Sequence, residues 1–84
     1  LIDVRTPEEY AEAHIDGAVN VELAEGMASK LPADAAGQTL EIYCRSGGRA
    51  TAAEQILRRA GYEVKNLGGV DDVLALGRTL SVGE

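Results

Sequence analysis

The sequence predicts a single small α/β domain: a parallel sheet of about four strands with helices on both faces. Strand-like apolar runs alternate with segments of helical spacing, and more than a dozen residues separate each strand from the next. Connections of that length suit right-handed crossovers between parallel strands better than hairpins. A chain of 84 residues is the size of one domain, so we assign residues 1–84 to it.

Composition excludes several classes of function. Fourteen acidic residues against eight basic ones give a net charge of −6, which argues against nucleic-acid and anionic-membrane partners. No apolar run approaches the roughly 18 residues of a membrane span. A single cysteine excludes an internal disulfide and a metal site of several cysteines, so we expect no bound metal.

The first helix has a clear start signal. Thr6 suits the N-cap, Pro7 the first helical position, and Glu9 can complete a capping box. This signal follows a β-leaning run at residues 1–4. We expect the helix to continue briefly through residues 10–14.

The middle of the chain contains the next two predicted strands. After a turn at 16–17, residues 18–21 form the second predicted strand. Apolar residues then recur at helical spacing over 23–31, and 32–38 is typical of a loop. Residues 39–43 are the clearest strand in the sequence.

The second half repeats the alternation of strand and helix. A helix is expected over about 49–60, because its apolar residues share one face and Gly61 is a natural C-terminal cap. A strand at 64–67, a tight glycine turn and a short helix at 70–76 follow. We expect the tail at 77–84 to be frayed.

Chemistry-bearing residues cluster where ligands bind such a sheet. Ligands of open parallel sheets bind at the carboxyl ends of the strands. That edge is expected to hold Asp3 and Arg5 after the first strand, Cys44 after the third, and Gly68 and Gly69 after the fourth. The only cysteine of the chain therefore falls at the predicted site.

The loop that follows this third strand favours a reactive thiol. Its glycines allow the backbone to turn and direct N–H groups inward, and the next helix begins close by. Two arginines add positive charge, and all of these features stabilise a thiolate. A buried structural cysteine before an ordinary glycine loop is the alternative, but the combination favours a catalytic one. The candidate site is Cys44 with Arg45, Ser46, Gly47, Gly48, Arg49 and Ala50.

Four landmarks resemble the rhodanese-fold sulfurtransferase family in the same order. They are the segments at 1–5, at 9–10 together with 14–20, at 44–50 and at 67–70, of which 44–50 is similar to the family's active-site loop. The resemblance covers about residues 1–76 and, among single-domain members, is strongest to the phage shock protein E type. It implies the rhodanese fold and the activity of a thiosulfate:cyanide sulfurtransferase.

The resemblance also implies a mechanism. The Cys44 thiolate would attack the outer sulfur of thiosulfate, release sulfite and keep a persulfide, so no separate cofactor is expected. Backbone N–H groups of 45–50 would hold the outer sulfur, and Arg45 and Arg49 would bind or attract the sulfonate end. Cyanide or a thiol, including thioredoxin-like proteins, would accept the sulfur, and we expect a monomer.

Three alternatives stay open. One is a rhodanese domain that binds or regulates a partner without catalysis, and another is a redox-sensing thiol. The third is a cysteine phosphatase or arsenate reductase, which would need arginine six positions after the cysteine. Ala50 occupies that position here and Arg49 comes one residue early, so this reading ranks below sulfur transfer.

Residues outside the loop are expected to have structural roles. His14, the only histidine, is interpreted as a packing and hydrogen-bonding residue, and Arg5 as a partner of Glu8, Glu9 and Glu12 in an ion-pair network. The chain begins with a leucine, so we expect an N-terminal segment to have been removed or trimmed. If that segment was a signal peptide, the resemblance implies a periplasmic protein of the stress response; otherwise we expect a cytoplasmic one.

Overall fold

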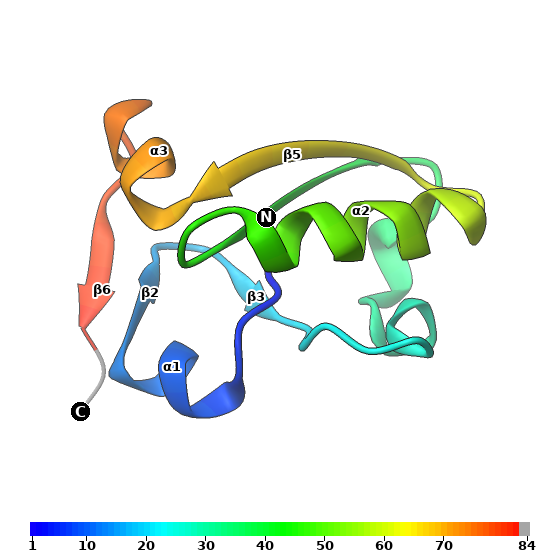
Figure 1. The fold of residues 1–84 in the computed structure, drawn as a ribbon, viewed down its shortest axis with the longest axis horizontal. Coiled ribbons are helices and arrows are strands. Elements are labelled where there is room, and N and C mark those ends of the chain that lie inside the picture. The colour runs from blue at the N-terminus through cyan, green and yellow to red at the C-terminus, as the bar shows by residue number, and fades with distance from the viewer. Residues whose placement is uncertain (83–84) are drawn as a thin grey trace.

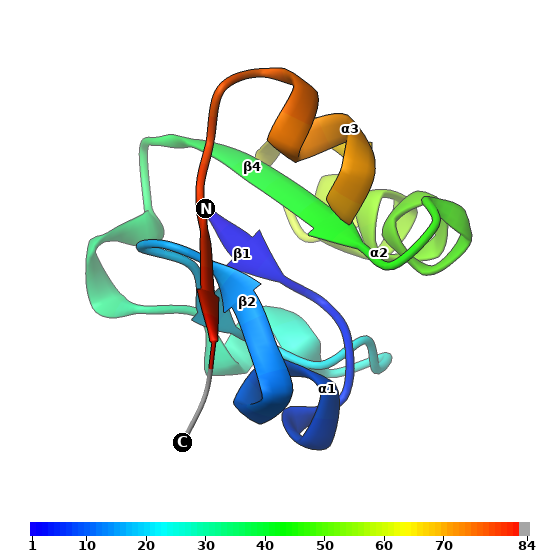
Figure 2. The ribbon, with the colours of Figure 1, turned by 90° about the vertical axis from the view of Figure 1, so that its left-hand side faces the viewer.

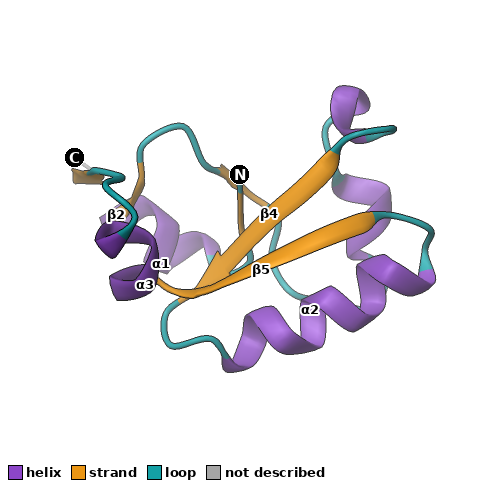
Figure 3. Cartoon of the chain, turned by 90° about the horizontal axis from the view of Figure 1, so that it is seen from above, coloured by secondary structure: helices purple, strands orange, loops and turns teal. Residues whose placement is uncertain are grey.

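The computed structural model describes residues 1–82 and contains a four-stranded parallel sheet (Figure 1). The order across the sheet is β3–β1–β4–β5. These strands are β1 (Ile2–Asp3), β3 (Val19–Asn20), β4 (Thr39–Cys44) and β5 (Glu63–Gly69). The sequence prediction of about four parallel strands is confirmed. Figure 3 shows the two longest strands, β4 and β5, side by side.

Pairing between β4 and β5 positions the cysteine. Leu40 lies opposite Val64 and the register is regular as far as Ile42. It then shifts, so that Cys44 lies opposite Gly69. The end of β4 is thereby set against the glycine pair at the end of β5.

Helices cover both faces of the sheet, as predicted. Alternate residues of β4 point to opposite faces. On one face Ile42 and Cys44 pack in the core cluster that contains the buried residues of α2 (Gly48–Arg59). On the other face Tyr43 packs with residues of β2 (Ala13–Ile15) and α3 (Val70–Ala75).

Helix α1 (Pro7–Glu12) begins where the sequence predicted and ends earlier. The Thr6 hydroxyl accepts a hydrogen bond from the Glu9 N–H at 3.2 Å, and the Glu9 carboxylate accepts one from the Thr6 N–H at 3.0 Å. The expected continuation through residue 14 is wrong, because Ala13–Ile15 form strand β2. Ile15 is buried there and its N–H donates to the Tyr43 hydroxyl at 3.0 Å.

The expected frayed tail is also wrong up to residue 82. Leu80–Val82 form strand β6, which pairs antiparallel with β2 and places Leu80 opposite Ile15 (Figure 2). This pairing satisfies backbone groups that β2 would otherwise leave unpaired. The expectation for residues 83–84 lies outside the described residues.

The apolar segment predicted as a helix over 23–31 forms only a single 3₁₀ turn, η1 (Met27–Lys30). A second 3₁₀ turn, η2 (Ala33–Ala35), lies within the predicted loop. No side chain caps η1, and Gly26 precedes it, so a longer helix has no start signal. Met27 is nevertheless fully buried in the core beside α2, which explains the apolar spacing.

Candidate active site

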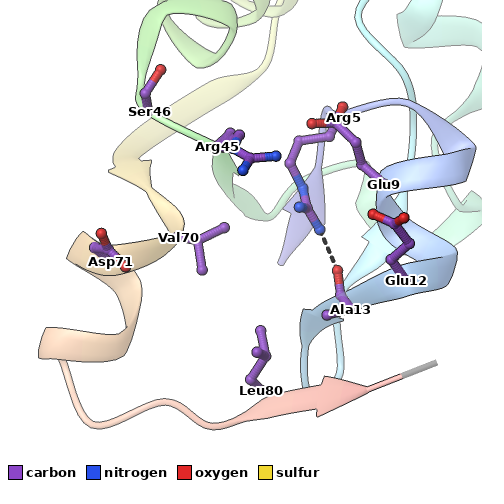
Figure 4. Close-up of a pocket in the computed structure, with 9 residues that line it drawn as sticks. All are labelled: Arg5, Glu9, Glu12, Ala13, Arg45, Ser46, Val70, Asp71 and Leu80. Carbon is purple, nitrogen blue, oxygen red and sulfur yellow. Dashed lines mark hydrogen bonds between the residues drawn. The ribbon is translucent and has the colours of Figure 1, made fainter.

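Three strand ends meet around a cavity of about 580 Å³ at the carboxyl edge of the sheet. Arg5 follows β1, Arg45 and Ser46 follow β4, and Val70 follows β5. The remaining walls come from α1, β2, α3 and β6, among them Leu80 (Figure 4). The cavity therefore lies at the edge that the sequence predicted for a ligand.

Cys44 lies at the end of β4, and only 1% of its surface is exposed. Its Sγ accepts two backbone hydrogen bonds, from the Gly47 N–H at 2.9 Å and from the Ala50 N–H at 3.3 Å. The loop thus turns around the sulfur with donors directed at it. Such donors stabilise negative charge on sulfur, as at other anion-binding turns.

The turn depends on glycine at one position in particular. Gly47 has a φ of 101°, in the left-handed region that residues with a side chain rarely adopt. It is also the N-cap of α2, which begins at Gly48. The first turn of this helix brings the Ala50 N–H to the sulfur, so the helix N-terminus contributes to the same site.

The glycine pair at the end of β5 packs against the outside of the loop. The Val70 N–H donates to the Arg45 carbonyl at 3.2 Å. A Cβ at Gly69 would lie 2.5 Å from that carbonyl oxygen and 2.9 Å from the Cα of Ser46. Only glycine allows this approach, and Asp72 holds the Gly69 N–H from the other side at 2.9 Å.

Arg49 is engaged by a carboxylate of α1. Its Nη1 and Nη2 donate to the Glu9 oxygens at 2.6 and 3.0 Å. These hydrogen bonds lower the pKa of Glu9 from 4.5 to about 2. Glu9 also closes the capping box with Thr6, so its side chain links the start of α1 to the first turn of α2. The sequence predicted that Arg49 binds or attracts the sulfonate end of the donor, and it gave no sign of this carboxylate partner.

Arg45 stands in contrast to Arg49. It is exposed, lines the cavity, and forms no side-chain hydrogen bond or ion pair within residues 1–82. Figure 4 shows its guanidinium extending toward Arg5 across the upper part of the cavity. Ser46 lines the same wall.

Arg5 has a structural role, as predicted, but with a different partner. It is buried, and its Nε and Nη2 donate to the carboxylate of buried Asp3 at 2.8–3.1 Å. The Tyr43 hydroxyl donates to the same carboxylate at 2.8 Å. The expected pairing with acids of α1 is wrong, because Asp3 and Arg5 are two residues apart on an extended segment and share a face. This spacing of two residues is the feature of the sequence from which the pairing of Arg5 with Asp3 could have been predicted.

Two side chains of this cluster, Arg5 and Tyr43, have shifted pKa values. The hydrogen bond from Arg5 to Asp3 raises the pKa of Arg5, and burial raises the pKa of Tyr43. Arg5 therefore stays cationic and Tyr43 neutral at physiological pH. Neither is free to exchange a proton in catalysis.

His14 packs as the sequence predicted. Its ring stacks on Tyr10 with centroids 3.8 Å apart, and Nδ1 lies 2.8 Å from the Tyr10 carbonyl. It does not line the cavity. Within residues 1–82 no group of three or more potential metal ligands comes together, and no helix is long and apolar enough to cross a membrane.

The profile of the rhodanese-like domain matches residues 1–75. The chain is 38% identical over 76 residues to the thiosulfate sulfurtransferase PspE of Escherichia coli, covering 86% of this chain and 71% of that protein. It is 42% identical over 69 residues to the HTH-type transcriptional regulator Rv0324 of Mycobacterium tuberculosis, covering 80% of this chain and 30% of the regulator.

Solved structures agree with these sequence matches. A structure described as a rhodanese with anions from E. coli superposes with a TM-score of 0.80 at 33% identity, covering 98% of this chain and 95% of that one. Protein hp1203 of Helicobacter pylori gives a TM-score of 0.75 at 25% identity, covering 98% and 76%. The likeness therefore extends over the whole fold described above.

Proposed function

Because this chain belongs to the rhodanese-like domain family, we propose that it is a sulfurtransferase that carries sulfur as a persulfide on Cys44. The observation that carries the proposal is the pair of backbone N–H groups directed at Cys44 Sγ. They favour the thiolate that must attack, and the same region of the loop can hold the outer sulfur of the persulfide.

Thiosulfate is the proposed donor. The thiolate attacks its outer sulfur, and a bond forms between that sulfur and Sγ. The bond between the two sulfur atoms of thiosulfate breaks, and its electron pair leaves with sulfite. The persulfide that remains is the only covalent intermediate, and neither a metal nor a further cofactor takes part.

Arg45 is the proposed contact for the sulfonate end of the donor. It is the guanidinium on the cavity wall without a carboxylate partner among residues 1–82, and it directly follows Cys44 in the chain. Arg49, held by Glu9, attracts the donor through its charge rather than through a direct contact. Ser46, Gly47, Gly48 and Ala50 complete the loop around the sulfur.

A thiol or cyanide is the proposed acceptor, including a thioredoxin-like thiol, with the protein acting as a monomer. The periplasmic location and the stress-response role stay predictions from the resemblance. A second candidate is a domain that binds a partner without turnover, which the likeness to part of a transcriptional regulator supports. The intact cysteine and its two N–H donors favour the enzyme.

The test is mass spectrometry of the intact protein after brief treatment with thiosulfate, followed by cyanide. We expect a gain of one sulfur atom that maps to Cys44 and is released as thiocyanate. Cys44→Ser is the matched control and gains nothing while retaining the fold by circular dichroism. An unmodified wild-type thiol would overturn the proposal in favour of the binding domain.

A further inference from the structure

Strand β5 contains an extra residue just before its glycine pair. Asn66 lies opposite Ile42. Two residues further along β4, Cys44 lies opposite Gly69, which is three residues beyond Asn66. A bulge of this kind interrupts the regular ladder of hydrogen bonds and changes the direction of the strand. Here it brings Gly69, rather than Gly68, opposite the cysteine.

The side chain of Asn66 stabilises this bulge. Its Oδ1 accepts a hydrogen bond from the Gly68 N–H at 2.8 Å. An asparagine that bonds to the backbone two residues further on stabilises a turn, because its side chain takes the place of a backbone partner. Asn66 therefore supplies an acceptor in the irregular part of β5 and fixes the backbone that leads into Gly69.

The other end of the same amide reaches α2. Its Nδ2 donates to the Glu54 carboxylate at 3.2 Å and to the Thr51 hydroxyl at 3.4 Å. Figure 3 shows α2 running beside β5, so this contact lies between the two elements. An N–H donor on one side and a carboxylate on the other fix the orientation of the amide. One half-buried side chain thus joins the bulge to the helix whose first turn contains the Ala50 N–H.

Both segments that Asn66 joins are in contact with the surroundings of the sulfur. On the β5 side, the bulge sets the glycine pair against the outside of the loop that follows Cys44. On the α2 side, the Thr51 hydroxyl donates to the Gly47 carbonyl at 3.1 Å. Gly47 is also the residue whose N–H donates to Sγ. A change at Asn66 therefore reaches the hydrogen bonds to the sulfur from two sides.

We propose that Asn66 is a positioning residue for the chemistry of Cys44. By joining the bulge to α2, it keeps the Gly47 and Ala50 N–H groups directed at Sγ. It acts through Gly68 and α2 rather than by contact with the sulfur. Hydrogen bonds weaken steeply when the donor turns away, and preorganised donors stabilise developing charge only where they are aimed. The inference rests on the proposed function, because it names a residue on which the persulfide chemistry depends.

The first test removes both hydrogen-bonding ends of the side chain with Asn66→Ala. In proton–nitrogen NMR spectra the Gly47 and Ala50 amide protons should move upfield, because their hydrogen bonds to sulfur weaken. Persulfide loading at saturating thiosulfate should slow about tenfold, less than the roughly hundredfold loss caused by removing such a donor outright. The KM for thiosulfate should stay unchanged, because no contact with the donor molecule is removed.

A second pair of variants tests the link to α2 alone. Asn66→Asp keeps an oxygen for the Gly68 N–H but places a carboxylate against that of Glu54, so loading should slow. Adding Glu54→Gln lets the amide at position 54 donate to the carboxylate at position 66. This double variant restores the hydrogen bond in the reverse direction and should recover most of the wild-type loading rate.

Leu40→Val is the control for a loss of stability alone. Leu40 is buried near the start of β4, at the opposite end of that strand from the cysteine. The change removes one methylene group from the core and destabilises the fold without touching the site. Its loading rate and its Gly47 and Ala50 amide resonances should equal those of the wild type.

Failure of this inference differs from failure of the proposed function. The positioning role would be overturned by wild-type loading in Asn66→Ala, by equal slowing in Leu40→Val, or by a double variant no faster than Asn66→Asp. Sulfur transfer would stand in each case. If the wild type loads no persulfide from thiosulfate, the proposed function itself fails. The two amide resonances then decide whether Asn66 positions the donors, because they do not depend on turnover.

Discussion

Two neighbouring strands, β1 and β4, end at the same edge of the sheet and are held there by different means. The segment at the end of β1 is held in place by side chains, because Asp3 accepts hydrogen bonds from Arg5 and Tyr43 in a buried cluster. After β4, backbone N–H groups and glycines shape the loop around Cys44 and leave Arg45 without a partner among residues 1–82. The difference separates a region whose charges are used for folding from one whose charges remain available to a ligand.

The largest effect is expected from breaking the side-chain region. Asp3→Asn leaves the Arg5 guanidinium buried without a counter-ion, and loss of one partner of such a pair costs about 3–5 kcal/mol. Urea unfolding followed by circular dichroism should show a loss of this size. Asp34→Asn, at an exposed carboxylate, is the control and should change stability by less than about 0.5 kcal/mol. A loss below about 1 kcal/mol for Asp3→Asn would show that this cluster does not hold the end of β1.

An intermediate effect is expected from breaking the backbone region. In Gly69→Ala the new Cβ would lie 2.5 Å from the Arg45 carbonyl oxygen, so the loop must move. Overpacking of this kind typically costs about 1–3 kcal/mol. We expect that loss in urea unfolding, together with slower persulfide loading from thiosulfate.

The control for this change is Gly26→Ala, because a Cβ there meets nothing within 4 Å and the residue has an ordinary negative φ. Its loading rate should equal that of the wild type. If Gly69→Ala also loaded at the wild-type rate, the close approach of the two loops would not shape the site.

The smallest effect is expected at the link between the regions, the pair of Glu9 with Arg49. Glu9→Gln keeps an oxygen for the Thr6 N–H and removes the charge, so stability near pH 7 should fall by less than about 1 kcal/mol. The pKa of Glu9 is lowered in the folded state, from 4.5 to about 2. Its contribution is therefore present above pH 4.5 and is lost as the pH falls toward 2.

Unfolding free energies of wild type and Glu9→Gln, measured from pH 7 down to pH 2, should converge over that interval. Glu8→Gln, one residue earlier on the same helix and exposed, should run parallel to the wild type. A difference for Glu9→Gln that does not change with pH would contradict the assignment of the charge pair.

Local signals predicted the elements that local interactions specify. The Thr6 capping box set the start of α1, and the glycines before α2 set its start to within one residue. The carboxyl edge of the sheet was predicted because three crossover connections leave few other arrangements of parallel strands. These features also positioned the loop around Cys44.

Partners far apart in the sequence were not predictable in this way. Tyr43 and Asp3 are 40 residues apart, as are Arg49 and Glu9, and no spacing rule links them. Strand β6 pairs with β2 across most of the chain, so neither segment contains the signal for the pairing. For the same reason Leu80 was not expected in the cavity wall.

The burial of Cys44 has a consequence for oxidative damage. An unpaired cysteine on a protein surface is prone to cross-link two copies of the chain, because a disulfide needs Cα atoms about 5.5 Å apart. Here the loop and the core enclose the sulfur, and 1% of the residue is exposed. A second copy cannot bring its own cysteine to that distance without displacing the loop. The fold therefore protects a nucleophilic sulfur from covalent dimerisation.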